Sequence, residues 1–309
     1  MSSNLYKVGE SNVSKTWLLM SGFALIIVLI GWFFSLYYDS LTIIYVFFLF
    51  ALLMNVFSFW FSDKIVLKLT GAKKVDKEEY YGLYTLVENL CITAGLPMPK
   101  IYVIDESAPN AFATGRDYEH SAVAFTSGLL ALLNKSELEG VIAHELSHIK
   151  NRDILLQSVV VVLVGLIALV TDFFIRSTFF LGDRDNKGNG LIMIIGLIGA
   201  IIIPIIAGFM QLAISRKREF LADSTGALMT RYPQGLASAL KKISEYPVAM
   251  KKASHATAHL FISDPFISGI KLQELHKNKK RSFFNKIFLT HPPVEERIQA
   301  LTGEDTNWD

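Results

Sequence analysis

Residues 144–148 read His-Glu-Leu-Ser-His, and this stretch decides how the rest of the chain is interpreted. On a helix, residues four apart lie on one face, so the imidazoles of His144 and His148 can bind the same metal ion. Glu145 lies about 100° round the helix from His144, near enough to act as a base on water without binding the metal. Two imidazoles and a neighbouring carboxylate are typical of hydrolytic zinc sites.

The flanking residues predict that this stretch is helical. Ser136 and Glu139 have the spacing of a capping box, with Ser136 as the N-cap. Apolar residues recur at helical spacing along the same segment, at Leu138, Val141, Ile142 and Ile149. The alternative is that the two histidines form a surface pair on an amphipathic helix.

The composition is that of a membrane protein. The chain has 309 residues, of which 51% are hydrophobic and only 19% are charged, and its mean hydropathy is +0.38. An ordinary soluble protein of this length is less apolar. The net charge of +2 gives no reason to expect a nucleic acid as partner. The single cysteine, Cys91, cannot form an internal disulfide, which favours a reducing compartment.

Several apolar stretches are long enough to cross a lipid bilayer, since a hydrocarbon core of about 30 Å takes about 20 helical residues. They are residues 17–38, 41–61, 154–175 and 190–214. Lys and Arg flank these stretches mainly on the side that carries both termini, whereas the loop between the first two contains neither. The positive-inside rule therefore places both termini and the His-Glu-Leu-Ser-His stretch in the cytoplasm.

This pattern divides the chain into alternating membrane and soluble segments. We expect transmembrane hairpins at residues 16–61 and 154–214, and soluble segments at residues 62–153 and 215–309. Neither soluble segment holds a full set of site residues, so the two should fold together as one domain.

Local patterns give that domain an α+β fold. Strands are expected at residues 100–105, 111–114 and 121–125 and helices at 76–93, 126–133, 216–228, 235–246 and 294–301. The helix at residue 76 should be capped by Asp76 and Glu79. Helices around a small, mostly antiparallel sheet are the expected arrangement.

A catalytic zinc ion needs a third protein ligand. Glu219 lies about one turn beyond the fourth apolar stretch and His148 about one turn before the third, which places both at a similar depth below the membrane. Asp223 shares a helix face with Glu219. We expect Glu219 as the third ligand and Asp223 as an acceptor for a ligating imidazole. An ion pair of Glu219 with Arg216 or Lys217 explains the spacing equally well.

The remaining motifs are less decisive. His255 and His259 are four residues apart, but no carboxylate lies between them, so ordinary hydrogen-bonded histidines are favoured over a second metal pair. His291 precedes two prolines, which fix an extended backbone and suit either a site residue or a structural cap. The basic residues at 271–282 favour a solvated loop over contact with anionic lipid.

Taken together, these motifs resemble those of the HtpX-type membrane zinc metalloproteases, relatives of the prenyl-protein CAAX metalloproteases. Besides the metal helix, the matching motifs are Asn151-Arg152-Asp153, Asn110-Ala111-Phe112-Ala113-Thr114-Gly115, Arg218-Glu219-Phe220-Leu221-Ala222-Asp223, Ala256-Thr257-Ala258-His259-Leu260-Phe261 and His291-Pro292-Pro293. The resemblance covers nearly the whole chain. It implies an integral membrane protein with four transmembrane helices and a cytoplasmic, zincin-like metalloprotease domain.

The resemblance also implies a role for each site residue. One zinc ion per chain would be held by His144, His148 and Glu219, with Glu145 as general base and Asp223 behind a ligand. Asn110 and His291 would contact the substrate or transition state. Ala111, Phe112, Ala113 and Thr114 would form an exposed edge strand on which the substrate backbone is laid.

The implied activity is cleavage of membrane proteins, such as damaged ones in envelope quality control, at the bacterial cytoplasmic (inner) membrane. The oligomeric state stays open. One alternative is a non-catalytic membrane scaffold with a structural metal, which the presence of Glu145 argues against, because a structural site needs four ligands and no base. The other is a prenyl-protein (CAAX) protease, for which four spans make too small a bundle to enclose a large chamber.

Overall fold

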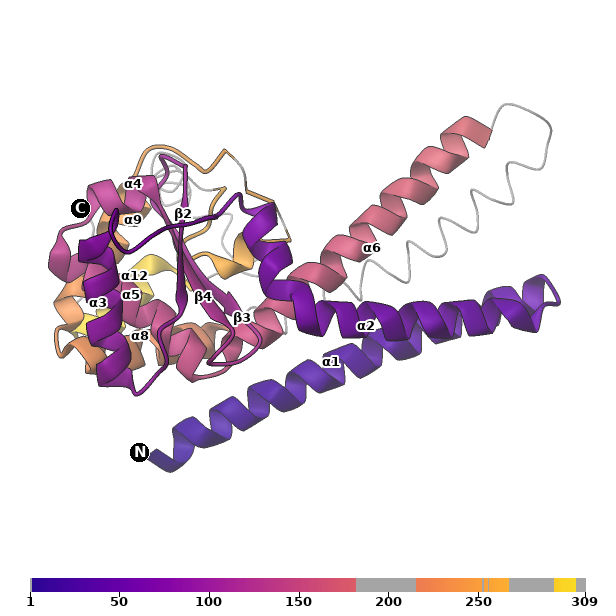
Figure 1. Ribbon diagram of the computed structural model, residues 1–309, viewed down its shortest axis with the longest axis horizontal. Coiled ribbons are helices and arrows are strands. Elements are labelled where there is room, and N and C mark those ends of the chain that lie inside the picture. Colours follow the sequence, from indigo (N-terminus) through magenta and orange to yellow (C-terminus); the bar gives the residue numbers. More distant parts are fainter. Residues whose placement is uncertain (1, 182–214, 252, 255, 267–291, 304–309) are drawn as a thin grey trace, which may run out of the picture.

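The computed structural model describes residues 2–181, 215–251, 253–254, 256–266 and 292–303. An α+β domain lies at one end of the molecule. Three long helices, α1 (Ser2–Tyr37), α2 (Leu41–Leu69) and α6 (Asp153–Leu181), extend from this end toward the same side (Figure 1). The expected fourth span at 190–214, the basic stretch at 271–282 and His291 lie outside the described residues.

Helices α1 and α2 form a hairpin whose outer surface is apolar. Segments Gly9–Tyr37 and Leu41–Leu69 are each long and apolar enough to cross a membrane. Large apolar side chains on both remain exposed, with Leu18 at 69% and Leu41 at 72%, which suits a surface that faces lipid. Both helices run beyond the apolar stretches, and α2 ends only at Leu69, before Gly71 in the left-handed conformation (φ 69°).

The third long helix has a different environment. The first part of α6, Asp153–Ile167, is a shorter apolar segment. Its side chains are buried rather than exposed, and they pack against apolar residues of α1 such as Leu19 and Phe23. The base of α6 is therefore part of the protein core, where the long helices meet the α+β domain.

The α+β domain contains a four-stranded sheet in the order β1-β2-β4-β3. The strands are β1 (Lys73–Lys74), β2 (Lys100–Ile104), β3 (Ala111–Gly115) and β4 (Ser121–Thr126). β2 and β4 are parallel, whereas the other two pairs are antiparallel, with Ala113 opposite Val123 in the β3–β4 pair. The mostly antiparallel sheet is confirmed, and the short strand β1 was not expected from the sequence.

Helix α5 (Lys135–Lys150) is the central helix of the domain and carries the His-Glu-Leu-Ser-His stretch. It contacts α3, α8, α9 and the strand β3. The other helices of the domain are α3 (Tyr81–Ala94), α4 (Ser127–Leu132), α8 (Arg216–Thr230), α9 (Pro233–Glu245), the 3-10 helix η1 (Ala258–Leu260) and α12 (Val294–Thr302). Segments from both soluble parts of the chain thus share one core.

The start of α5 differs from the sequence prediction. The N-cap is Asn134, whose side chain accepts a hydrogen bond from the Glu137 backbone (3.0 Å), while the Glu137 carboxylate accepts one from the Asn134 backbone (2.9 Å). The capping box predicted at Ser136 and Glu139 is therefore wrong by two residues. Tertiary contacts favour the observed box, because the buried Glu137 carboxylate also binds Lys242 of α9 (2.8 Å).

The start of α3 was also predicted too early. Residues 77–80 form a turn, and the helix begins at Tyr81 without the predicted cap by Asp76 and Glu79. Its end agrees with the prediction, because Gly95 closes the helix in the left-handed conformation (φ 67°).

Candidate metal centre

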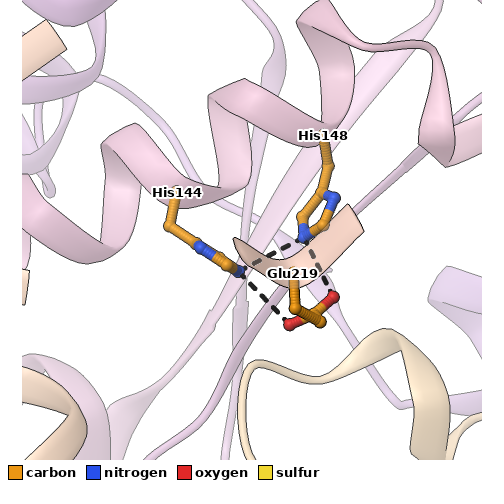
Figure 2. Close-up of side chains that lie close together, drawn as sticks. All are labelled: His144, His148 and Glu219. Atoms are coloured by element: carbon orange, nitrogen blue, oxygen red, sulfur yellow. Dashed lines mark hydrogen bonds and ion pairs between the residues drawn. The ribbon is translucent and has the colours of Figure 1, made fainter. Parts of the chain in front are cut away.

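Two histidines of α5 and one glutamate of α8 converge on a single point (Figure 2). Nε2 of His144 lies 3.2 Å from Nε2 of His148. The Glu219 carboxylate oxygens lie 3.9 Å from His144 Nε2 and 3.7 Å from His148 Nε2. A tetrahedral ion with bonds of about 2.05 Å needs ligand atoms about 3.3 Å apart, so the spacing suits such an ion. Glu219, expected as the third ligand, is thus brought to the two histidines.

A close approach between helices brings α8 to the metal helix. A Cβ atom on Gly226 of α8 would lie 3.0 Å from the backbone nitrogen of His144, so a larger residue there would push the helices apart. Glu219, Asp223 and Gly226 are spaced by four and three residues and share one face of α8. Gly226 therefore allows the two acidic side chains to reach the histidines.

Each candidate histidine ligand has a carboxylate on its other ring nitrogen. Nδ1 of His144 lies 2.9 Å from Asp223, and Nδ1 of His148 lies 3.0 Å from Asp153. With the proton held on Nδ1, the lone pair of Nε2 points into the cluster, which is the arrangement that supports metal binding. The expected place of Asp223 agrees with the structure. Asp153 is the last residue of the Asn151-Arg152-Asp153 motif, and nothing in the sequence indicates its contact with His148.

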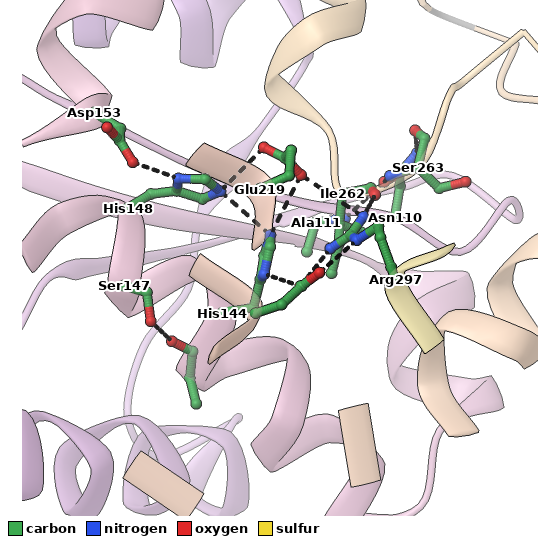
Figure 3. A network of polar contacts seen from close by, with 12 residues as sticks. Asn110, Ala111, His144, Ser147, His148, Asp153, Glu219, Ile262, Ser263 and Arg297 are labelled. Carbon is green, nitrogen blue, oxygen red and sulfur yellow. Dashed lines mark hydrogen bonds and ion pairs between the residues drawn. The ribbon is translucent and has the colours of Figure 1, made fainter. Parts of the chain in front are cut away.

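A buried arginine of α12 completes the network and was missed entirely (Figure 3). Arg297 donates two hydrogen bonds to the Asp223 carboxylate (2.8 and 2.7 Å) and one to the Ile262 carbonyl (3.0 Å). Its guanidinium also lies 3.7 Å from Glu219. The sequence shows only that Arg297 lies three residues after the apolar Val294, on the same helix face. The burial of its side chain, which is 2% exposed, is visible only in the tertiary structure.

The pKa values of the histidines differ because their neighbours differ. Burial lowers the pKa of His144, although the contact with Asp223 opposes this shift. Burial also acts to lower the pKa of His148, but the hydrogen bond to Asp153 and the charge of Glu219 outweigh it and raise the pKa to about 9. In the absence of a metal ion, His148 therefore carries the positive charge of the pair near neutral pH.

Glu145 lies beside the metal cluster but is not a member of it. Burial raises the pKa of its carboxyl group to about 7, and a backbone hydrogen bond from Ala113 opposes this shift. Its Oε2 atom is buried and has no hydrogen-bond partner among the described residues. A carboxylate with a pKa near 7 and a spare lone pair suits a general base.

The strand β3 lies next to Glu145 but is not exposed as expected. The backbone carbonyl of Asn110 accepts a hydrogen bond from the backbone N–H of Thr126 in β4 (3.0 Å). In an antiparallel pair, residues that bond to the partner strand alternate with residues that do not. The backbone N–H and C=O groups of Ala111 and Ala113 therefore point away from β4. The backbone of Ile262 donates to the Ala111 carbonyl (3.0 Å). Residues 111–114 are at most 2% exposed. The expectation of an exposed strand is wrong, because packed helices and the segment around Ile262 cover it.

The Asn110 side chain is already engaged within the protein (Figure 3). Its Nδ2 donates to the Ser263 carbonyl (3.0 Å), and its Oδ1 accepts from the backbone of Ala111 (3.1 Å) and of Ser263 (3.3 Å). These bonds fasten the segment around Ile262 to the start of β3. The expected contact of Asn110 with a substrate would require the side chain to release Ser263.

His259, one residue of the rival histidine pair, is not part of the metal cluster found among the described residues. The ring Nε2 of His259 lies 3.3 Å from the carbonyl of Gln157 in α6, and the side chain is 2% exposed. Its predicted partner His255 lies outside the described residues. The contact with Gln157 agrees with the prediction that His259 is an ordinary hydrogen-bonded histidine.

Comparison with known proteins agrees with this geometry. Residues 79–305 match the model of peptidase family M48. The chain belongs to this family. A protease HtpX homolog of Thermoanaerobacter pseudethanolicus is 47% identical over 304 residues, which cover 96% of this chain and 97% of the relative. A second protease HtpX homolog, of Dictyoglomus thermophilum, is 41% identical over 304 residues, 98% of this chain and 96% of the relative.

A solved structure shares the fold of this M48 peptidase. The crystal structure of S. mikatae Ste24p aligns with a TM-score of 0.50 at 16% identity, covering 97% of this chain and 67% of that protein. The predicted HtpX-type family is therefore confirmed, and the chain is a membrane metalloendopeptidase with a buried cluster that can hold a metal ion.

Proposed function

We propose that this M48 peptidase uses one zinc ion per chain to cleave membrane proteins from the cytoplasmic side of the bacterial inner membrane. The observation that carries the proposal is the cluster of His144, His148 and Glu219, whose ligand atoms lie within 4.8 Å of one another. Glu145 lies beside these ligands with a pKa of about 7. Three ligands and an adjacent base are the requirements of a catalytic zinc site, whereas a structural site would need a fourth ligand.

The donor set supports zinc in particular. Two imidazole nitrogens and one carboxylate oxygen match zinc hydrolases, and the carboxylates on both Nδ1 atoms keep the Nε2 atoms free for the ion. When bound, zinc would supply a Lewis acid that polarises a peptide carbonyl and makes water more acidic.

The protein's own residues would then position groups and move protons. Glu145 would accept the proton of the attacking water on its carboxylate and deliver it to the leaving amine, and its pKa of about 7 suits both transfers near neutral pH. Asp223 and Asp153 would keep the imidazoles oriented, and Arg297 would keep Asp223 ionised and in place. Asn110 and His291 stay candidates for contact with the substrate or transition state.

The substrate backbone would add along the outer side of β3 only after the segments that cover this buried strand move and the Ala113 N–H leaves Glu145. Main-chain pairing of this kind tolerates many sequences, which suits a peptidase that removes damaged membrane proteins. The Ala111 carbonyl already accepts a hydrogen bond from Ile262 (3.0 Å), so the segment around Ile262 would have to move or would limit how far the substrate strand extends.

The membrane arrangement is part of the proposal. Two hairpins, at residues 16–61 and 154–214, would give four transmembrane helices, with the protease domain at 62–153 and 215–309 in the cytoplasm. The apolar windows of α1 and α2 support the first hairpin. The excess of Lys and Arg beside the soluble segments supports the orientation.

A test measures how the purified full-length protein and its Glu145→Gln variant cleave two substrates in detergent that contains zinc. One is an unfolded membrane protein, and the other is a prenylated peptide with a C-terminal CAAX motif. Cleavage of the first, zinc-dependent and lost in Glu145→Gln, is the expected result. Cleavage of the prenylated peptide alone would replace this proposal with that of a prenyl-protein protease.

A further inference from the structure

We propose that Asn12 of α1 is a positioning residue of the metal centre, which it reaches through Asp153 and His148. The first membrane helix would then be needed to hold a metal ligand, in addition to anchoring the protein. The inference rests on the metal centre proposed above, and it concerns a residue that lies outside the domain carrying that centre.

The contacts form a continuous chain. Nδ2 of Asn12 donates to Oδ1 of Asp153 (2.5 Å), and Oδ2 of Asp153 lies 3.0 Å from Nδ1 of His148. One carboxylate is thus shared between an amide of the first membrane helix and an imidazole of the metal cluster. Asn12 is 1% exposed and Asp153 is 0% exposed, so bulk water does not reach either side chain.

Asn12 also binds the turn that joins the metal helix to α6. Its Nδ2 donates to the carbonyl of Asn151 (3.0 Å), the residue that caps the end of α5. The next residue, Arg152, has a left-handed backbone conformation (φ 56°), which is unfavourable for residues other than glycine. The amide therefore bridges both sides of a strained turn that sets the direction of Asp153.

These contacts affect the metal because the position of Asp153 determines where the His148 ring points. A carboxylate behind a ligating imidazole fixes its tautomer and orientation, and removing such partners typically weakens metal binding by about 10 to 100-fold. Without the amide of Asn12, one oxygen of a buried carboxylate loses a donor, and the carboxylate can turn toward other charges. Arg218 is close enough to interact with Asp153 and would attract it.

The experiment measures the zinc affinity of full-length protein in detergent by competition with a chelator. Asn12→Ala removes the amide, and Asn12→Asp keeps its size but replaces the donor with an acceptor. We expect both to weaken zinc binding by about 10-fold and to change the visible absorption spectrum of the cobalt-substituted protein. The exposed neighbour Ser11 gives the surface control, Ser11→Ala, which should change neither.

A second control separates this role from simple packing of α1. Thr16 is another buried polar residue of the same helix (1% exposed), and its hydroxyl donates only within α1, to the carbonyl of Asn12 (2.9 Å). Thr16→Val should leave zinc affinity within about twofold of wild type, which corresponds to less than 0.5 kcal/mol. Equal weakening by Thr16→Val and Asn12→Ala would overturn the proposal, because helix packing would then explain both.

A double mutant tests whether Asn12 acts through Asp153. In an Asp153→Asn background, adding Asn12→Ala should weaken zinc binding no further, since the mediating carboxylate is already lost. If Asn12→Ala weakens zinc binding by the same factor in the Asp153→Asn background as in wild type, Asn12 does not act through Asp153 and the proposal is refuted. If every Asn12 variant fails to fold while Thr16→Val folds, the amide serves the fold instead and the inference is wrong. A wild-type protein that binds no zinc would instead refute the proposed metal centre itself.

Discussion

Replacing Glu145 by Gln should make the metal-free protein more stable at alkaline pH, even though the same change should lower peptidase activity. The two side chains have nearly the same size, and only the glutamate can ionise. Burial raises the pKa of Glu145 from 4.5 to about 7. The folded protein therefore retains this proton at pH values where the unfolded chain has already lost it. Stability falls as the pH rises from 4.5 through 7, and it stays lower above 7.

The size of the effect follows from the shift. A difference of about 2.5 pKa units, 7 minus 4.5, corresponds to about 3 kcal/mol at 1.36 kcal/mol per unit. Glu145→Gln lacks this pH-dependent penalty. Its advantage over wild type should therefore grow by about 3 kcal/mol between pH 4.5 and pH 8, or roughly 6 °C in melting temperature for a protein of this size.

Thermal unfolding in detergent with a chelator, at pH 4.5 and pH 8, measures this difference. The exposed Glu78 provides a matched control, since Glu78→Gln makes the same chemical change at a side chain on the surface. A constant difference between Glu145→Gln and wild type would refute the reasoning, because Glu145 would then titrate alike in the folded and unfolded chains. With zinc present, the same variant should keep its metal and lose peptidase activity by about 10²-fold or more.

Three further outcomes are expected. Glu219→Ala should abolish activity and lose zinc, measured by metal analysis of the purified protein, and full zinc occupancy would remove Glu219 from the ligand set. Arg297→Leu should destabilise the fold by about 3–5 kcal/mol, because it leaves the buried carboxylate of Asp223 without its arginine counter-charge. Adding Asp223→Asn should recover part of the melting temperature but not the activity, and no recovery would show that another contact of Arg297 dominates. Cysteine introduced at Asp39 should react with an impermeant reagent from outside the cell and cysteine at Ser136 should not, whereas labelling at Ser136 would contradict a cytoplasmic site.

The sequence predicted the cluster of His144, His148 and Glu219 because two of the three residues lie on one helix. Once residues 144–148 form a helix, their four-residue spacing places His144 and His148 on one face, independently of the tertiary structure. Spacing alone does not distinguish Glu219 as a ligand from Glu219 in an ion pair with Arg216 or Lys217. The close contact of α8 with α5 at Gly226 was needed to bring the carboxylate within 3.9 Å of His144.

Errors occurred where tertiary contacts compete with local signals. Ser136 and Glu139 have good capping spacing, but the observed box uses Glu137, whose buried carboxylate also binds Lys242 of α9. Residues 111–114 have a strand pattern, and the strand is observed. Their exposure depends on the segment around Ile262, which is about 150 residues away in the chain.

The sequence alone determined the chemistry and the membrane character of this protein. Helical periodicity sets which side chains share a face, and the length of an apolar run sets whether it can cross a bilayer; both are local properties. Tertiary structure alone decided how the ligands are held. Asp153, Arg297 and Asn12 support the site from three different helices, and each is recognisable only when distant segments are packed together. A buried polar group needs a hydrogen-bond partner, and the fold decides which residue that partner is. The spacing of residues along the sequence does not show it.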